Sequence, residues 1–194
     1  MRNFRRVFGP GKPVIAMVHL GALPGAPLHD AEAGLEGLIA AARADGIAVT
    51  TPEALVADAL TATGAASLEA GSMALGAVSG STVAARTTAG DLAVAGTLTA
   101  TGAASLEAAG AIGLGGARAG TLTATAAGTL ALGPAAVDGA ATLTGAAVEL
   151  GALSAGAAGV TARTGDLAAS GPLSVAGVAR LSAGGDAGLG AVSA

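Results

Sequence analysis

Apolar and polar residues alternate through the later part of the chain, in short runs that each end at a glycine. Between Leu92 and Gly116, one phase of the alternation is apolar and the other is mostly small, hydroxyl-bearing or charged. The apolar phase comprises Leu92, Val94, Leu98, Ala100, Ala104, Leu106, Ala108, Ile112 and Leu114, and the opposite phase carries Thr97, Thr99, Ser105 and Glu107. A period of two residues is typical of a β-strand with one buried face. We therefore predict short strands here, separated by corners at the glycines.

The glycines also argue against a helix in this Ala-rich region. Gly96, Gly102, Gly110 and the pair at 115–116 each close a short alternating run. An interior glycine costs a helix about 1 kcal/mol relative to alanine, so few windows are long enough to propagate one. We expect these glycines to supply the positive φ angles that tight corners require.

The same region repeats itself with a fixed period of about 38 residues, and such self-similarity is the sequence signature of a solenoid. The decapeptide TATGAASLEA occurs at 61–70 and again at 99–108. Looser copies begin at Gly139 and Gly177, which follow Gly102 at nearly the same spacing. The window 51–62 could form a helix, with Thr51 as its cap and Pro52 at its first helical position. Because this window aligns, one period earlier, with the strand-like segment 91–100, we predict strand there too.

Such a period is most simply explained by two coils of a parallel β-helix, each of about 19 residues. Each coil would pair with the coils above and below it at a spacing of about 4.8 Å, and like side chains would stack along the axis. Residues 46–194 would then form about seven to eight coils of an all-β solenoid. The narrow interior of a coil accounts for a core of Ala, Leu and Val without aromatic residues.

Composition and charge exclude several classes of function. Charged residues make up 11% of the chain, its net charge is −4, and its one lysine is Lys12. The sequence has no basic stripe that could follow a phosphate backbone, so we expect no nucleic-acid partner. It has no uninterrupted apolar stretch of the roughly 18 to 20 residues that cross a bilayer, so we expect no membrane span. The absence of Cys excludes disulfides and thiolate metal sites.

The repeats resemble those of a known class of surface proteins. Runs such as GDLAVAGTLTATGAASLEAAGAIGLGG and TGDLAASGPLSVAGVARLSAGG resemble the β-helical shafts of filamentous haemagglutinin-like adhesins, which are exported by two-partner secretion. The resemblance covers residues 47–194 and implies a right-handed parallel β-helix that acts as a stalk or adhesive surface. It also implies a secreted or cell-surface location. The chain shows no convincing signal peptide, so a cytoplasmic location is the alternative.

The first 45 residues resemble a different family. The segment KPVIAMVHLGALPGAPLHDAEAGLEGLIAAARAD resembles the opening of the BtpA-like (β/α)-barrel family, which is linked to photosystem I biogenesis. Its residues indicate a buried strand at 14–20, a Pro/Gly loop, and an amphipathic helix at 31–44. A barrel needs eight such units, and only one is present. We expect residues 1–45 to be a truncated unit that serves as an N-terminal cap, and the join near residue 46 to mark a chimeric chain.

Few residues are candidates for chemistry. His19 and His29 are the only imidazoles, and with Asp30 and Glu32 nearby they suggest a metal or general-base site. Because the rest of the barrel is missing, we interpret both as loop residues. The glycine cluster 113–116 lacks the Lys-Ser/Thr of a phosphate-binding loop. We interpret the following carboxylates as solvating residues that also hinder edge association: Glu69, Asp91, Glu107, Asp138, Glu149, Asp166 and Asp186. We interpret four arginines as surface charges: Arg86, Arg118, Arg163 and Arg180.

The sequence therefore predicts a structural or adhesive module. We expect no catalytic, cofactor-binding or metal site, no cofactor and no enzymatic activity. Binding to an unidentified extracellular ligand is expected through rows of hydroxyl side chains: Thr97, Thr99, Thr121, Thr123, Thr142 and Thr144. Unprotected solenoid ends also predict end-to-end self-association. The alternative function is that of a BtpA-like barrel protein, represented only by its first β/α unit.

Overall fold

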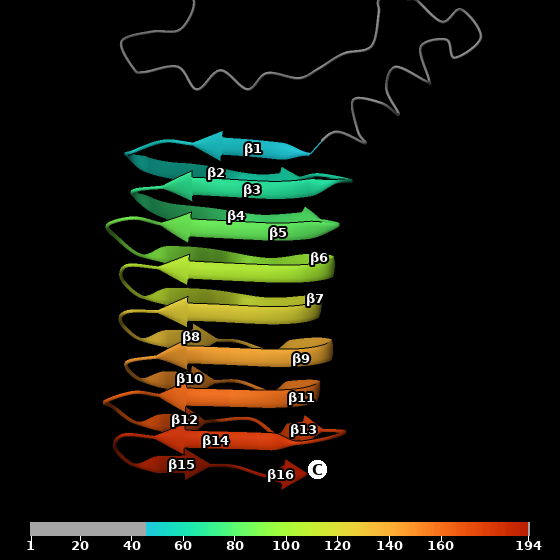
Figure 1. The fold of residues 1–194 in the computed structure, drawn as a ribbon, viewed down its shortest axis with the longest axis vertical. Helices are drawn as coiled ribbons and strands as arrows, with labels where there is room; N and C mark the ends of the chain where they lie inside the picture. Colours follow the sequence, from blue (N-terminus) through green and yellow to red (C-terminus); the bar gives the residue numbers. More distant parts are fainter. Residues whose placement is uncertain (1–45, 194) are drawn as a thin grey trace, which may run out of the picture. The chain divides into compact units, whose positions relative to one another are not determined.

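The computed structural model describes residues 46–193, and these residues form one parallel β-solenoid of about eight coils (Figure 1). They contain strands and no helix. The strands are β1 (Ile47–Thr50), β2 (Ala54–Thr61), β3 (Ala65–Ala70), β4 (Ser72–Gly80), β5 (Thr82–Thr87), β6 (Leu92–Ala108), β7 (Ile112–Ala126), β8 (Leu130–Leu132), β9 (Ala135–Gly145), β10 (Val148–Leu150), β11 (Leu153–Ala162), β12 (Leu167–Ala169), β13 (Leu173–Val175), β14 (Ala179–Ala183), β15 (Ala187–Leu189) and β16 (Val192–Ser193). The predicted all-β solenoid is confirmed. The strand, loop and helix predicted within residues 1–45 lie outside the described residues.

Each coil contributes to three faces that run along the solenoid. The first face contains the opening residues of β2, β4, β6 and β7, followed by β8, β10, β12 and β15. The second face contains the later residues of β2 and β4, the middle of β6 and β7, the start of β9 and β11, and then β13 and β16. The third face contains β1, β3, β5, the closing residues of β6, β7, β9 and β11, and then β14. In Figure 1 the third face is nearest the viewer and its strands run to the left, while the strands behind it run to the right as the chain descends, so the winding is right-handed.

The pairing register explains the period seen in the sequence. Leu92 pairs with Ile112, and Ile112 pairs with Leu130, so two coils carry the chain from Leu92 to Leu130. The next two coils carry it from Leu130 through Val148 to Leu167. Both steps match the spacing of the sequence repeats. The prediction of two coils to a period is confirmed.

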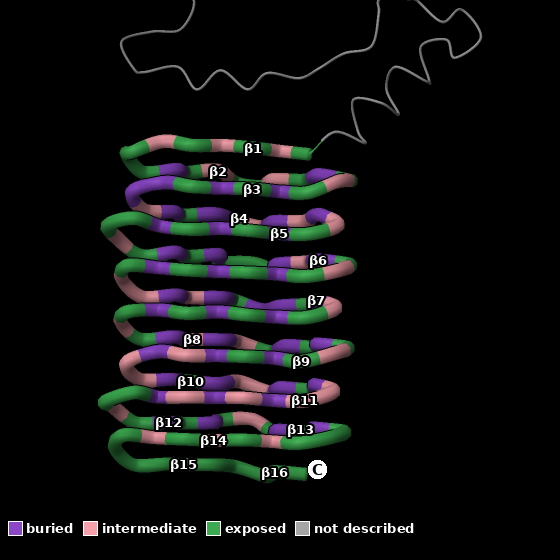
Figure 2. Tube along the Cα trace, in the orientation of Figure 1, coloured by how far each residue is buried: buried purple, intermediate pink, exposed green. Residues whose placement is uncertain are grey.

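Inward-facing residues stack into apolar ladders along the axis, and Figure 2 shows the resulting alternation of buried and exposed positions. On the first face the ladder consists of Met73, Leu92, Ile112, Leu130, Val148 and Leu167, each at most 3% exposed. Every residue assigned to the apolar phase between Leu92 and Gly116 is buried. Full burial of one such side chain stabilises the folded state by about 1.5–3 kcal/mol, so these ladders are the main source of stability.

The glycines have a different role from the one predicted. The backbone φ angles of the glycines at the predicted corners lie outside the left-handed region: Gly96, Gly102, Gly110, Gly115 and Gly116. A Cβ added at Gly115 would instead lie 2.1 Å from the carbonyl oxygen of Ala95, in the preceding coil. A Cβ at Gly133 would lie 2.1 Å from the oxygen of Gly115. The prediction of positive φ was wrong here. At Gly96 and Gly115 a side chain is excluded because the backbone of the preceding coil lies too close.

The corner between the third and first faces changes length in a fixed order. Three residues lie between Thr51 and Leu55, two between Ala70 and Met73, four between Thr87 and Leu92, and three between Ala108 and Ile112. The same order recurs in the next four coils, at the corners that follow Ala126, Gly145, Ala162 and Ala183. The true structural repeat is therefore four coils, twice the period noticed in the sequence, and Leu92 corresponds fully to Leu167.

Candidate binding surfaces

Two carboxylates have a structural role. Asp91 Oδ1 accepts a hydrogen bond from the backbone N–H of Ala111 at 2.7 Å, and Asp166 Oδ1 accepts one from the N–H of Asp186 at 2.8 Å. Both acids lie in the four-residue corner of their repeat, and each bonds to the shorter corner of the next coil. Their interpretation as solvating residues was therefore incomplete. The other five acids in that group are exposed on the outside of the coils.

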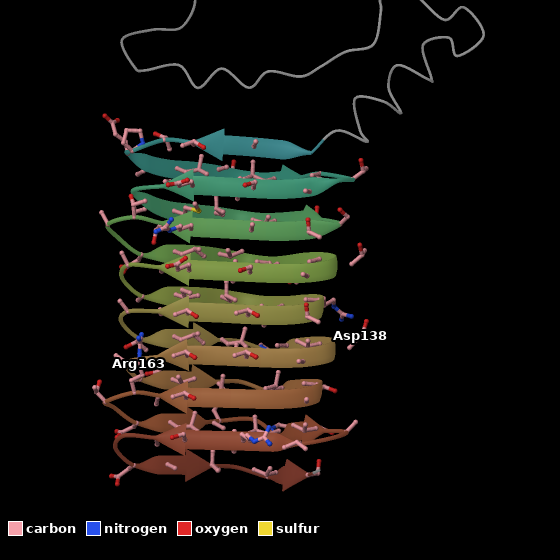
Figure 3. The ribbon with its side chains drawn as sticks, in the orientation of Figure 1. Asp138 and Arg163 are labelled. Carbon is pink, nitrogen blue, oxygen red and sulfur yellow. The ribbon has the colours of Figure 1, made fainter. Side chains whose placement is uncertain are left out.

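Arg163 also does more than solvate the surface. Its guanidinium Nη2 donates a hydrogen bond to the backbone oxygen of Ala126, which belongs to an earlier coil. This bond joins a corner to the end of β7, two coils before it. Figure 3 shows Arg163 at the left edge of the solenoid and Asp138 at its right edge. The Asp138 side chain is exposed on the outside of its coil.

One polar side chain is buried among the described residues. Thr87 is 2% exposed and its Oγ1 donates a hydrogen bond to the backbone oxygen of Gly90 at 2.6 Å. In neighbouring coils the same inward position holds Ala70 and Ala108. The hydroxyl is tolerated inside the solenoid because the four-residue corner provides its acceptor.

Charged side chains gather at one end of the third face. Glu69 pairs with Arg86 in register, and Arg86 pairs with Glu107. The Nε of Arg86 lies 3.6 Å from Oε2 of Glu107, and both side chains are more than half exposed. An ion pair this exposed contributes little to stability. Its effect is to make this part of the face polar and charged.

Further along the third face the rows change from charge to hydroxyl. Thr125 pairs with Thr144, and Thr144 pairs with Thr161. In the adjacent row, Thr123 pairs with Thr142. Neighbouring coils lie about 4.8 Å apart and alternate residues about 6.6 Å apart, so these side chains form a regular lattice of hydroxyl and methyl groups. We call this patch of Thr123, Thr125, Thr142, Thr144 and Thr161 the threonine lattice.

The predicted threonine rows are divided between two faces. Thr99 belongs to the second face, where it pairs with Ser79 on one side and Arg118 on the other. Thr97 also lies on the second face, at its corner with the first. The sequence alone did not separate these residues from the third-face threonines because the face of a residue depends on the length of every preceding corner.

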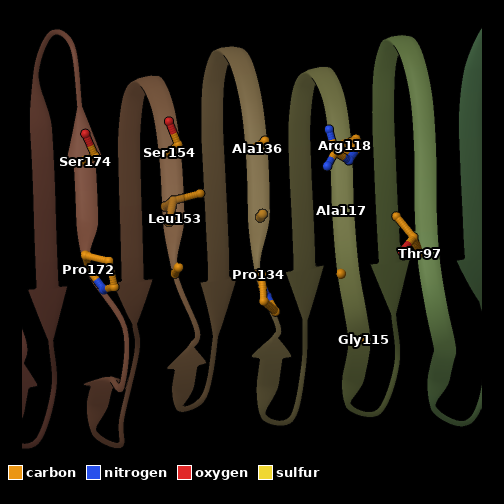
Figure 4. Close-up of a pocket in the computed structure, with 13 residues that line it drawn as sticks. Thr97, Gly115, Ala117, Arg118, Pro134, Ala136, Leu153, Ser154, Pro172 and Ser174 are labelled. Atoms are coloured by element: carbon orange, nitrogen blue, oxygen red, sulfur yellow. The ribbon is translucent and has the colours of Figure 1, made fainter.

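A shallow trough follows the corner between the first and second faces. Five of its lining residues come from successive coils: Thr97, Gly116, Pro134, Ala152 and Pro172. Figure 4 shows Arg118, Ser154 and Ser174 along one side of this hollow of about 420 Å³. A second hollow of about 760 Å³ shares Gly115, Pro134 and Ala152 with it and includes Glu149. The trough is long, shallow and mostly lined by small residues.

The trough brings together few reactive groups. Ser154 and Ser174 have no histidine beside them among the described residues, because His19 and His29 lie outside residues 46–193. The acids of these coils are spread along the solenoid, and no three of them gather where a metal could bind. Within the same range there is no helix long and apolar enough to cross a membrane.

Comparison with known proteins adds no relative to this description. No protein-family model, no curated protein and no solved structure matches the chain.

Proposed function

We propose that the solenoid is a structural and adhesive module, a stalk that attaches to a polar surface through its threonine lattice. The observation that carries this proposal is the unbroken stack of inward ladders beneath a flat third face, with Thr125, Thr144 and Thr161 in register on its outside. Strands that pair on both sides and cores that continue from coil to coil give a stiff support. Rows of identical groups on such a support favour broad contacts that are individually weak and collectively strong.

The shape of the surface supports binding rather than turnover. Catalysis needs a nucleophile, base or metal held near a partner group in a pocket that excludes water. The described coils instead offer a flat lattice and a shallow trough. The described coils contain no histidine that could act as a base for the serines that line the trough. We propose that the chain has no enzymatic activity and that attachment is its function. This role is the one implied by the resemblance to haemagglutinin-like shafts, and it would place the module at the cell surface or outside the cell.

The test compares two double variants that add the same charge to different faces. Thr123→Lys with Thr144→Lys puts two lysines into the threonine lattice, where bulk and charge disrupt the flat contact. Ala93→Lys with Ala131→Lys puts two lysines on the outside of the first face as the control. Beads coated with each protein are counted after binding to a panel of glycan- and matrix-coated surfaces. We expect the first variant alone to lose attachment by about tenfold or more, since many weak contacts are lost together. Equal attachment by both variants would contradict the proposal.

A further inference from the structure

The first and last described coils are in phase with each other. In the four-coil repeat, coil 47–62 corresponds to 122–137, and coil 179–193 corresponds to 104–118. Those two corresponding coils stack directly on each other: Ala104 pairs with Leu122, and Ile112 with Leu130. The first coil of a second copy therefore carries the corner length and inward residues that would follow the last coil.

The last described coil leaves two of its inward residues exposed. Leu189 and Val192 occupy inward ladder positions and are 40% and 45% exposed. One repeat earlier, the same positions hold Leu114 and Ala117, which are 4% and 2% exposed because another coil covers them. Exposed apolar residues beside unpaired backbone groups favour the addition of a further strand.

The N-terminal edge differs from every later coil at one stacked column. Glycines occupy this column in successive coils: Gly76, Gly96, Gly115, Gly133 and Gly151. A Cβ at Gly76 would lie 2.0 Å from the oxygen of Asp58, and a Cβ at Gly133 would lie 2.1 Å from the oxygen of Gly115. The column starts in the first coil with Asp58, whose side chain is exposed. If a second copy stacked in phase, the Cβ of Asp58 would meet backbone where only glycine fits.

A second residue of the first coil, Pro52, cannot donate the hydrogen bond that would join this coil to a second copy. Ala127 holds the position of Pro52 one repeat later, and its N–H donates to the oxygen of Ala108 at 3.0 Å. Pro52 has no N–H, so the corresponding oxygen of Ala183 in a second copy would lose its partner. Proline and charge at a sheet edge are two features by which proteins prevent edge-to-edge pairing.

We propose that Pro52 and Asp58 terminate the solenoid by closing its first coil to the C-terminal coil of a second copy. The last coil would otherwise accept that copy in register, and a head-to-tail contact of this kind does not close into a ring but grows into a fibre. This inference goes beyond attachment, because it concerns how the first coil prevents association with a second copy of the chain. It also revises the expectation of end-to-end association, since one of the two ends is blocked.

The experiment uses the full chain and the double substitution Pro52→Ala with Asp58→Gly. We expect the wild type to sediment as a monomer over the accessible concentration range. The double variant should form oligomers whose mean mass rises with concentration, with an association constant higher by at least about tenfold, the effect of one regained hydrogen bond. Pro172→Ala with Asp138→Gly is the matched control, because it removes the same two side chains from the flank of the solenoid, and we expect it to remain monomeric.

A third variant identifies the surface that the opened edge meets. Adding Val192→Asp to the double variant places a charge in the inward ladder of the last coil, which should restore the monomer. Three outcomes would overturn the proposal: a double variant that stays monomeric, a wild type that assembles as readily as the variant, or a control that assembles equally well. Assembly that persists after Val192→Asp would overturn the head-to-tail contact with a second copy.

Discussion

Asp91 and Ala111 join neighbouring coils through a backbone N–H that donates to a carboxylate oxygen at 2.7 Å. Asp166 and Asp186 make the same bond at 2.8 Å, at the equivalent place in the next four-coil repeat. Each bond begins at the longest corner of its repeat, which has one residue more than the corresponding corner of the next coil. The side-chain oxygen thus links two corners of unequal length.

Removing this carboxylate should destabilise the solenoid. Asp91→Ala leaves the N–H of Ala111 without its charged acceptor, and we expect a loss of about 1–2 kcal/mol in the free energy of unfolding. Asp91→Asn keeps an oxygen in place and should lose less. Urea unfolding followed by circular dichroism measures both. Asp138→Ala is the control and should be close to neutral. Equal losses for Asp91→Ala and Asp138→Ala would show that the bond contributes nothing.

The close approach of the coils predicts opposite effects for two nearby glycines. A Cβ at Gly115 would lie 2.1 Å from a backbone oxygen, whereas one at Gly113 would have no atom within 4 Å. We expect Gly115→Ala to cost about 1–3 kcal/mol through overpacking. Gly113→Ala should be neutral or stabilising by up to about 1 kcal/mol, because alanine restricts the unfolded chain. Thermal unfolding of the two variants distinguishes this account from one in which both glycines serve backbone flexibility, where both substitutions would destabilise alike.

Substitution of the two histidines should leave attachment unchanged. The proposed binding surface is the threonine lattice, and His19 and His29 belong to the segment before the described coils. The variant His19→Ala with His29→Ala should therefore bind coated surfaces as the wild type does. A turnover of any small molecule that disappears with His19 would contradict the proposal and favour the barrel alternative.

Much of the fold follows from local pattern, and the remainder depends on distances between coils. The alternation between Leu92 and Gly116 identified a set of apolar residues that are all buried, because burial on one face of a strand needs only a period of two. The role of Gly115 could not be read in the same way, since its contact is with Ala95 in another coil. The bond of Asp91 left a trace in the sequence: Gly-Asp-Leu recurs at 90–92 and 165–167, but the intermediate copy at 128–130 has Thr. That difference marks the four-coil repeat, which the shorter period concealed.

The most direct test of the solenoid is its register, and the chain is suited to it because it contains no cysteine. Thr125 pairs with Thr144 in the next coil, and Thr144 pairs with Thr161 in the coil after that, so Thr125 and Thr161 are two coils apart. Cysteines at 125 and 144 would have Cα atoms about 4.8 Å apart, within the range of a disulfide, whereas cysteines at 125 and 161 would be about 9.6 Å apart and too distant. Intact-mass measurement after mild oxidation should therefore find an intramolecular disulfide in Thr125→Cys with Thr144→Cys and none in Thr125→Cys with Thr161→Cys. A disulfide in the second pair, or none in the first, would contradict the parallel β-solenoid.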